Sequence, residues 1–331
     1  MTMKVLLVGA GAVGISYGYY LAQGGAEVTF YVKPNHAEGL RAGSTVYFPK
    51  KRGVREPIVF AASGGSQGGG YRVATALDEV RATAWDAVFL CMSATALRGP
   101  WLSPFLAALG PPTTLVMLTP GAEDFAFLSQ HFPPERIVAG LITLVAWQSP
   151  LPEEAPHAPG IAVWFPPMTK LPFWGAPSLT GPIVATLKAG GAPAKHAGDV
   201  VKPGGTVAGG ILSSHIAALE GAGWTFAGLS KSSLKQVAAR ASREAVVVLA
   251  AHQGVRPPWS RTFVRPWLMG AGLRLAAWRM PFDFEVYLRY HFTKVRDQTA
   301  FTLGELVRIG RDRGLPVDAI EELRVAVFGA G

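Results

Sequence analysis

Residues 1–40, MTMKVLLVGAGAVGISYGYYLAQGGAEVTFYVKPNHAEGL, contain the pattern that decides the fold. An apolar run over 5–8 leads directly into Gly9, Gly11 and Gly14, which are spaced as G-x-G-x-x-G. In a dinucleotide site the first glycine permits the turn, the second lets the pyrophosphate approach the backbone, and the third lets helix pack on strand. The alternative is an ordinary glycine-rich turn.

The context of the glycines favours the dinucleotide site. A strand precedes them, an apolar helix is predicted over 15–23, and a second strand over 27–32 follows Gly24-Gly25. Amides at the start of such a helix face the phosphate anion. The predicted cofactor contacts in this turn are Gly9, Ala10, Gly11, Ala12, Val13 and Gly14.

The residue after the second strand indicates which cofactor binds. NAD sites usually place Asp or Glu there for the ribose hydroxyls, but this chain has Lys33, with His36 and Arg41 behind it. A cation would pair with a 2′-phosphate, so the predicted cofactor is NADP(H), bound with Lys33 and His36. Alternatively, Lys33 is only a solvated loop residue.

Composition restricts the class of protein. The net charge is +9, yet no basic run is long enough to follow a nucleic-acid backbone, so an anionic cofactor and a small-molecule substrate are expected, with no nucleic acid. The single cysteine, Cys91, excludes a disulfide within the chain and a cysteine-rich metal site, which fits a cytoplasmic protein. No apolar run approaches the ~20 residues of a membrane span, so no stable membrane insertion is expected.

Strands and helices alternate after the opening unit. Apolar runs over 86–92, 113–118 and 136–147 are typical of buried parallel strands, with helical segments between them. This predicts an α/β fold with a doubly wound, mainly parallel sheet. Ligands lie at the carboxyl ends of such strands, so we expect cofactor contacts at Met92, Ser93, Pro120 and Gly121.

The pattern changes in the second half of the chain. The proline-rich stretch 149–182 contains two short runs, IAVWF and LPFWG, predicted as antiparallel additions to the sheet, before a helix over 182–189. From about His196 onward only helical periodicity is found. We therefore predict an NADP-binding Rossmann domain over 1–195 and a helical substrate or dimerisation domain over 196–331. The predicted helices of the latter cover 206–220, 234–252, 284–312 and 318–327.

The arrangement resembles the ketopantoate reductase (2-dehydropantoate 2-reductase) family. The resemblance covers nearly the whole chain and is carried by GAGAVGISYGYYLAQGG, DAVFLCM, LVMLTPG, RIVAGLITLVA and LGELVRIGRDRGLPVDAIEEL. It implies a Rossmann domain followed by an all-helical domain, with NADPH-dependent reduction of an oxo compound between them. It also implies Lys202 as the catalytic lysine that opens the first long helix of the helical domain.

Several of the family's polar positions are replaced in this chain. The family usually has a lysine where Ser93 stands and an asparagine where Pro120 stands. Asparagines follow its catalytic lysine where this chain has Thr206 and Gly210, and its late glutamate falls on Gln298. The resemblance implies reduction of a small oxo or imine compound, and the replaced positions indicate a compound other than ketopantoate. The alternative is a non-catalytic NADP(H)-binding sensor or regulatory protein.

Other residues are candidates on side-chain chemistry alone. His215 could serve as the acid instead of Lys202, because histidine titrates near neutrality. Lys294 and Gln298 on the predicted helix 284–312 could face the substrate, with Ser93 and Thr206 as further substrate contacts. The aromatic and basic segment 257–281 could be a lid, a homodimer contact, a membrane-surface element or a core-packing helix.

Overall fold

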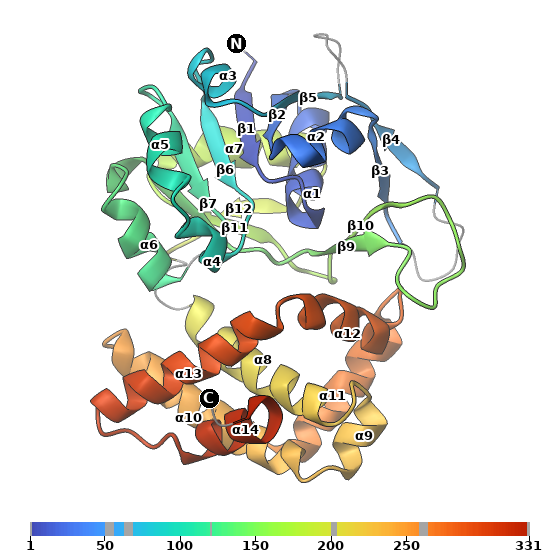
Figure 1. The fold of residues 1–331 in the computed structure, drawn as a ribbon, viewed down its shortest axis with the longest axis vertical. Coiled ribbons are helices and arrows are strands. Elements are labelled where there is room, and N and C mark those ends of the chain that lie inside the picture. Colours follow the sequence, from blue (N-terminus) through green and yellow to red (C-terminus); the bar gives the residue numbers. More distant parts are fainter. Residues whose placement is uncertain are drawn as a thin grey trace. The chain divides into compact units, whose positions relative to one another are not determined.

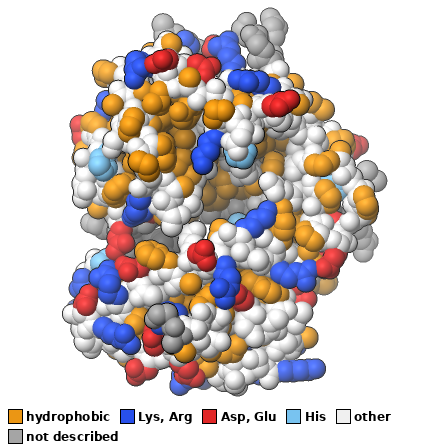
Figure 2. All heavy atoms as spheres, viewed as in Figure 1, with side chains coloured by type: hydrophobic (Ala, Val, Ile, Leu, Met, Phe, Trp, Pro, Cys, Tyr) orange, Lys and Arg blue, Asp and Glu red, His pale blue; other side chains and the backbone are white. Residues whose placement is uncertain are grey.

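A computed structural model describes residues 2–49, 56–62, 69–119, 121–199, 204–257 and 264–329 (Figure 1). The chain divides into two compact units with the boundary between Val201 and Lys202, and Leu151–Glu154 belong to the second unit. Figure 2 shows one face, on which lysine and arginine side chains are interspersed with aspartate and glutamate.

The first unit is organised around an eight-stranded sheet with the order β12-β11-β8-β7-β6-β1-β2-β5. Neighbouring strands from β8 to β5 run parallel, whereas β11 pairs antiparallel with β8. The bounds are β1 Lys4–Val8, β2 Glu27–Tyr31, β5 Tyr71–Ala74, β6 Ala87–Leu90, β7 Thr114–Met117, β8 Ile137–Gly140, β11 Leu171–Trp174 and β12 Ala194–His196. The doubly wound, mainly parallel sheet predicted from the sequence is confirmed.

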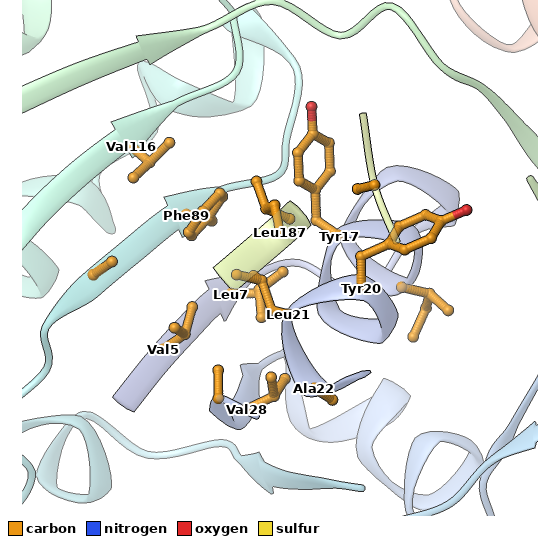
Figure 3. Packing of buried hydrophobic residues seen from close by; sticks show 14 of the residues in the cluster. Val5, Leu7, Tyr17, Tyr20, Leu21, Ala22, Val28, Phe89, Val116 and Leu187 are labelled. Carbon is orange, nitrogen blue, oxygen red and sulfur yellow. The ribbon is translucent and has the colours of Figure 1, made fainter. Parts of the chain in front are cut away.

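Helices cover both faces of this sheet because successive strand residues point to opposite sides. On one face Val5, Leu7 and Phe89 pack against α1 and α7, as Figure 3 shows. On the other face Leu6 and Val88 belong to a second buried cluster with α3, α4, α5 and α6. The helix bounds are α1 Ala12–Gln23, α2 Pro34–Arg41, α3 Leu77–Arg81, α4 Ala94–Leu97, α5 Leu102–Ala107, α6 Ala122–Ser129 and α7 Pro177–Ala189, with a 3-10 turn, η1, at Pro134–Arg136.

A second, four-stranded sheet has the order β4-β3-β10-β9. Its strands are β3 Ser44–Tyr47, β4 Ile58–Phe60, β9 Val145–Ser149 and β10 Gly160–Trp164. The single strand predicted over 136–147 was therefore wrong: it is two strands, β8 and β9, in different sheets. The proline-rich runs also separate, because LPFWG forms the predicted antiparallel addition, β11, whereas IAVWF forms β10 in the second sheet.

The described part of the second unit beyond residue 204 consists of helices. They are α8 Gly204–Gly221, α9 Phe226–Lys231, α10 Leu234–His252, α11 Pro266–Arg279, α12 Phe284–Lys294, α13 Arg296–Asp312 and α14 Asp318–Phe328. Small and aliphatic residues such as Ala217, Ala241, Leu303 and Leu323 form their shared core. The helix predicted over 284–312 was wrong as one piece, because Val295 leaves helical geometry with φ −118° and ψ 27°.

Candidate functional site

The carboxyl ends of four neighbouring parallel strands, β2, β1, β6 and β7, lie along one edge of the main sheet. Val8 is level with Tyr31 on one side and with Leu90 on the other, and Leu90 is level with Met117. Segments that follow these strands therefore emerge together. This register brings to one edge the glycine turn, Lys33 and His36, Met92 and Ser93, and Gly121.

The glycine turn has the backbone geometry that the sequence pattern requires. Gly9 has φ +99°, and its amide donates to the carbonyl of Tyr31 at 3.0 Å. A Cβ on Gly9 would stand 2.9 Å from the carbonyl oxygen of Cys91. A Cβ on Gly14 would stand only 2.1 Å from the carbonyl oxygen of Gly9. The protein's own packing therefore demands glycine at both positions.

Gly11 differs from its two neighbours in the motif. A Cβ built on it meets no atom within 4 Å, so the fold itself does not require glycine there. Gly11 is the N-cap of α1, without a side-chain cap, and the first turn of α1 has no acidic residue. The open space and the helix amides fit a dinucleotide pyrophosphate, whose close approach a side chain would obstruct.

Lys33 and His36 follow the end of β2. Lys33 is the N-cap of α2, directly after Val32, and both Lys33 and His36 are exposed. A helix N-terminus favours anions, so the lysine's charge does not serve the stability of α2. Lys33, the start of α2 and His36 therefore make up one corner at the end of β2, where the ammonium of Lys33 and the helix N-terminus carry positive charge.

Arg41 does not belong to that corner. It lies in the last turn of α2, at the opposite end of the helix from Lys33. The backbone amides of Thr75 and Ala76, and then the positive charge of Arg41, hold the pKa of the Glu79 carboxyl below its usual value. The charge of Arg41 thus acts on a carboxylate of α3.

The segments after β6 and β7 complete the described edge. Ser93 is the N-cap of α4, and its hydroxyl accepts a hydrogen bond from the Ala96 amide at 3.3 Å. Met92 and Ser93 are half-buried. Gly121 is the N-cap of α6, whereas Pro120 lies outside the described residues. The start of α4 and that of α6 therefore both border the edge.

An ion pair that the sequence reasoning missed joins these two segments. Arg98 Nη1 lies 2.6 Å from Oδ1 of Asp124, in the first turn of α6, and 2.8 Å from the carbonyl of Ala94. The separation of 26 residues gives no local sequence signal. An acid in the first turn of a helix is expected for the helix alone, so only the fold reveals its partner.

Cys91 has no feature of a reactive thiol. It continues β6, donates its amide to the carbonyl of Val8 at 3.0 Å and packs against the core below α1. Burial raises the pKa of this thiol, which keeps it protonated at neutral pH. Its role is packing behind the glycine turn.

The predicted catalytic residues belong to the second unit. Lys202 lies outside the described residues. The backbone of Thr206 belongs to α8, but its side chain is not described. His215, also on α8, is only 8% exposed. Its Nδ1 lies 2.9 Å from the carbonyl of Ile211 and 3.2 Å from Oγ of Ser242. Desolvation lowers its pKa, so the imidazole is neutral at pH 7.

Lys294 and Gln298 do not share one helical face, contrary to the prediction. Lys294 ends α12 and Gln298 lies in the first turn of α13, with the break at Val295 between them. The ammonium of Lys294 instead lies over the Tyr290 ring, 3.7 Å from its centroid. Both Lys294 and Gln298 are exposed, and the unbroken face proposed for them does not exist.

Two absences hold for the described residues only. No group of three or more His, Cys, Asp or Glu side chains among them could hold a metal ion. No described helix is long and apolar enough to cross a membrane.

Comparisons with solved structures identify the fold. D-mandelate dehydrogenase, solved with NADH and anilino(oxo)acetate, matches with a TM-score of 0.71 at 16% identity, covering 98% of this chain and 97% of the other. A PanE/ApbA family ketopantoate reductase from Ralstonia eutropha JMP134 has a TM-score of 0.66 at 19% identity, with coverages of 98% and 97%. A 2-dehydropantoate 2-reductase from Geobacter metallireducens GS-15 has a TM-score of 0.64 at 15% identity, covering 98% of this chain and 99% of the other.

Sequence comparison adds the family. No curated protein matches the chain in sequence. The family model described as ketopantoate reductase PanE/ApbA matches residues 5–170, which include the glycine turn and the strands whose ends form the edge. The chain therefore belongs to the ketopantoate reductase PanE/ApbA family, a family of NAD(P)H-dependent oxidoreductases.

Proposed function

We propose that the chain is an NADPH-dependent reductase of a small oxo or imine compound other than ketopantoate. The observation that carries the proposal is the pairing of an open, uncapped Gly11 N-cap with a lysine at the end of β2. The first suits a pyrophosphate and the second a 2′-phosphate, so NADP(H) is proposed over NAD(H). Bound NADPH would supply the hydride.

The residues of this chain would orient and protonate the substrate. Lys202 is proposed as the donor to the developing oxyanion, with Ser93 and Thr206 as polar contacts, on the family resemblance. His215 is a weaker choice of acid, because its lowered pKa leaves it unprotonated at neutral pH and its Nδ1 lies against the carbonyl of Ile211. Lys294 and Gln298 stay proposals for binding an anionic group.

Cofactor binding is tested first, on the wild-type chain. Titration with NADPH and with NADH, followed by nicotinamide fluorescence, should give at least about tenfold tighter binding of NADPH. Equal affinity for both cofactors would refute NADP(H) preference. Absence of binding to either would refute the reductase altogether.

Turnover is tested with oxo acids, ketones and imines in the presence of NADPH. Ketopantoate belongs in the panel, as does the oxo acid corresponding to mandelate, because D-mandelate dehydrogenase has a similar fold. For a substrate that is reduced, Lys202→Ala should lower kcat at least about 100-fold with unchanged NADPH affinity. His215→Gln should leave kcat within a few-fold of wild type.

A non-catalytic NADP(H)-binding protein is the second candidate. It is favoured by the replaced polar positions, Ser93, Pro120 and Gln298, and by the break at Val295 that separates Gln298 from Lys294. Tight NADPH binding without oxidation across the whole panel would support it. Loss of a measured activity in Lys202→Ala, with the cofactor still bound, would exclude it.

A further inference from the structure

Helix α11, Pro266–Arg279, packs against the core of the second unit on one side and exposes large apolar side chains on another. Its sequence, PWLMGAGLRLAAWR, contains two arginines and no other charged residue. Leu273 packs with the core of the second unit. Leu275 is 59% exposed and Trp278 is 66% exposed. Two large apolar side chains exposed together on one helix are suited to contact with a partner.

The exposed side has a defined arrangement of charge and apolar surface. At about 100° per residue, Trp278 and Leu275 lie next to each other around the helix, between Arg274 and Arg279. All four side chains are exposed. The surface is therefore an aromatic and an aliphatic side chain with a guanidinium on each flank. We call these four residues the α11 surface.

The surrounding sequence is strongly basic. Residues 256–280 contain five arginines and neither aspartate nor glutamate, within a chain of net charge +9. The described arginines Arg256 and Arg265 are exposed, as are those of the α11 surface. The partner must therefore be anionic as well as able to accept Trp278 and Leu275.

We propose that the α11 surface binds peripherally to an anionic lipid bilayer. Tryptophan and leucine would enter the interface between headgroups and acyl chains, while Arg274 and Arg279 would contact lipid phosphates. A second copy of the chain fits this surface less well, because a symmetric pairing would oppose the same arginines. A nucleic acid would satisfy the arginines but leave the aliphatic Leu275 without an apolar environment. The proposal is independent of the proposed reductase activity.

The test is flotation of the full-length protein with lipid vesicles. Vesicles of phosphatidylcholine with about one-third phosphatidylglycerol should carry the protein at low salt and release it at high salt. Vesicles of phosphatidylcholine alone should carry it at least about tenfold less well, since each arginine near an anionic surface contributes about fivefold in binding. Equal binding to both vesicles, or none to the anionic ones, would overturn the proposal.

Two double variants divide the α11 surface into its parts. Arg274→Gln with Arg279→Gln should weaken binding to anionic vesicles by about 25-fold, which is fivefold for each charge. Leu275→Ser with Trp278→Ser should weaken it by at least about tenfold. The matched control is Phe301→Ser on α13, which removes another exposed apolar residue, 63% exposed, and should leave binding within about twofold.

Folding and self-association are measured on the same variants. Thermal unfolding shows that each variant is folded, and light scattering gives the mass in solution. If the α11 variants halve the mass of the protein, the surface is a dimer interface and the membrane proposal fails. It fails equally if Phe301→Ser loses as much binding as the α11 variants, or if an oligonucleotide binds through the same residues more tightly than the vesicles.

Discussion

The guanidinium of Arg98 and the carboxylate of Asp124 form an ion pair of 2.6 Å between the segments that follow β6 and β7. The Asp124 side chain is only 12% exposed, and Arg98 also lies over the Phe127 ring, 5.1 Å from its centroid. Both segments border the edge of the main sheet formed by the carboxyl ends of β2, β1, β6 and β7. Their mutual position is therefore fixed by a side-chain contact in addition to the strands that they follow.

Breaking this ion pair should lower both the stability of the protein and its affinity for NADPH. We expect Asp124→Asn to lower the free energy of unfolding by about 1 kcal/mol, because it leaves the partly exposed Arg98 without its charge partner. NADPH affinity should fall a few-fold. A double-mutant cycle with Arg98→Gln, followed by urea unfolding, should give a coupling of about 1 kcal/mol. The ion pair of Arg81 and Asp78 is the control. Its side chains are 59% and 91% exposed, respectively, so its double-mutant cycle should give no more than about half that coupling energy.

Gly11 and Gly14 should respond differently to alanine. Gly11→Ala meets open space in the protein, so Tm should be unchanged while NADPH affinity falls by at least about tenfold. Gly14→Ala places Cβ against the Gly9 carbonyl and should cost about 1–3 kcal/mol of stability or more. Thermal unfolding of the protein without cofactor separates the two effects. A destabilised Gly11→Ala with normal affinity would contradict the assignment.

The charge of Lys33 should decide between the cofactors. A charge-assisted hydrogen bond to a phosphate contributes about 1.5–3 kcal/mol, so Lys33→Gln should weaken NADPH binding by about 10- to 100-fold. NADH binding should change by less than about threefold, because NADH lacks the 2′-phosphate. Arg41→Gln is the matched control, since Arg41 faces Glu79 at the other end of α2. Parallel losses for both cofactors in Lys33→Gln would show that the lysine only supports the fold.

Two histidines should make the second unit sensitive to acid. Burial lowers the pKa of His215, and burial followed by the charge of Lys294 lowers that of His291. Below about pH 6.5 the unfolded chain binds protons that the folded chain takes up only at lower pH. Stability is therefore complete above that pH and falls with acidification. Urea unfolding at neutral and acidic pH should show a shallower loss in His215→Gln and in His291→Gln, and the shallowest in the double variant.

The buried hydroxyl of Tyr17 should be dispensable. Tyr17 is fully buried on α1, and its oxygen has no hydrogen-bond partner among the described residues (Figure 3). Tyr17→Phe should therefore raise the free energy of unfolding by about 1 kcal/mol. Tyr71→Phe gives the contrast, because the Tyr71 hydroxyl donates to the Leu40 carbonyl at 2.5 Å, and its removal should cost about 1 kcal/mol. Equal effects of the two changes would be unexpected.

The sequence predicted those parts of the fold whose cause is local. The βαβ opening, the apolar strands at β6 and β7, and helix α10 with its bounds of 234 and 252 follow from periodicity and glycine placement. The break at Val295 was missed because apolar and charged residues continue across it without glycine or proline. The assignment of β9 and β10 to a second sheet depends on β3, about 100 residues earlier, and no local pattern contains that pairing.

The position of the glycine turn and of Lys33 at one edge of the sheet was predictable for the same reason, whereas the surroundings of Arg98 and His215 were not. Glycine spacing and a strand end fix Gly9, Gly14 and Lys33 within one continuous segment. The pairing of Arg98 with Asp124 joins residues on different elements. The burial of His215 depends on helix packing: α8 carries it against α10, where Ser242 approaches it. Residue type alone therefore could not give the burial of His215 or its lowered pKa.

Helices α1 and α7 are in contact although they are far apart in the sequence, so they are synthesised at different times. A Cβ on Gly24 would stand 2.0 Å from the Thr186 carbonyl oxygen, and one on Gly190 would stand 1.8 Å from that of Tyr20, so the two helices touch backbone to backbone. About 150 residues separate them in the chain. At roughly 5–20 residues per second of translation, the nascent α1 spends on the order of 10 s without α7, the helix that covers it. During synthesis, α1 is therefore made well before the helix against which it packs.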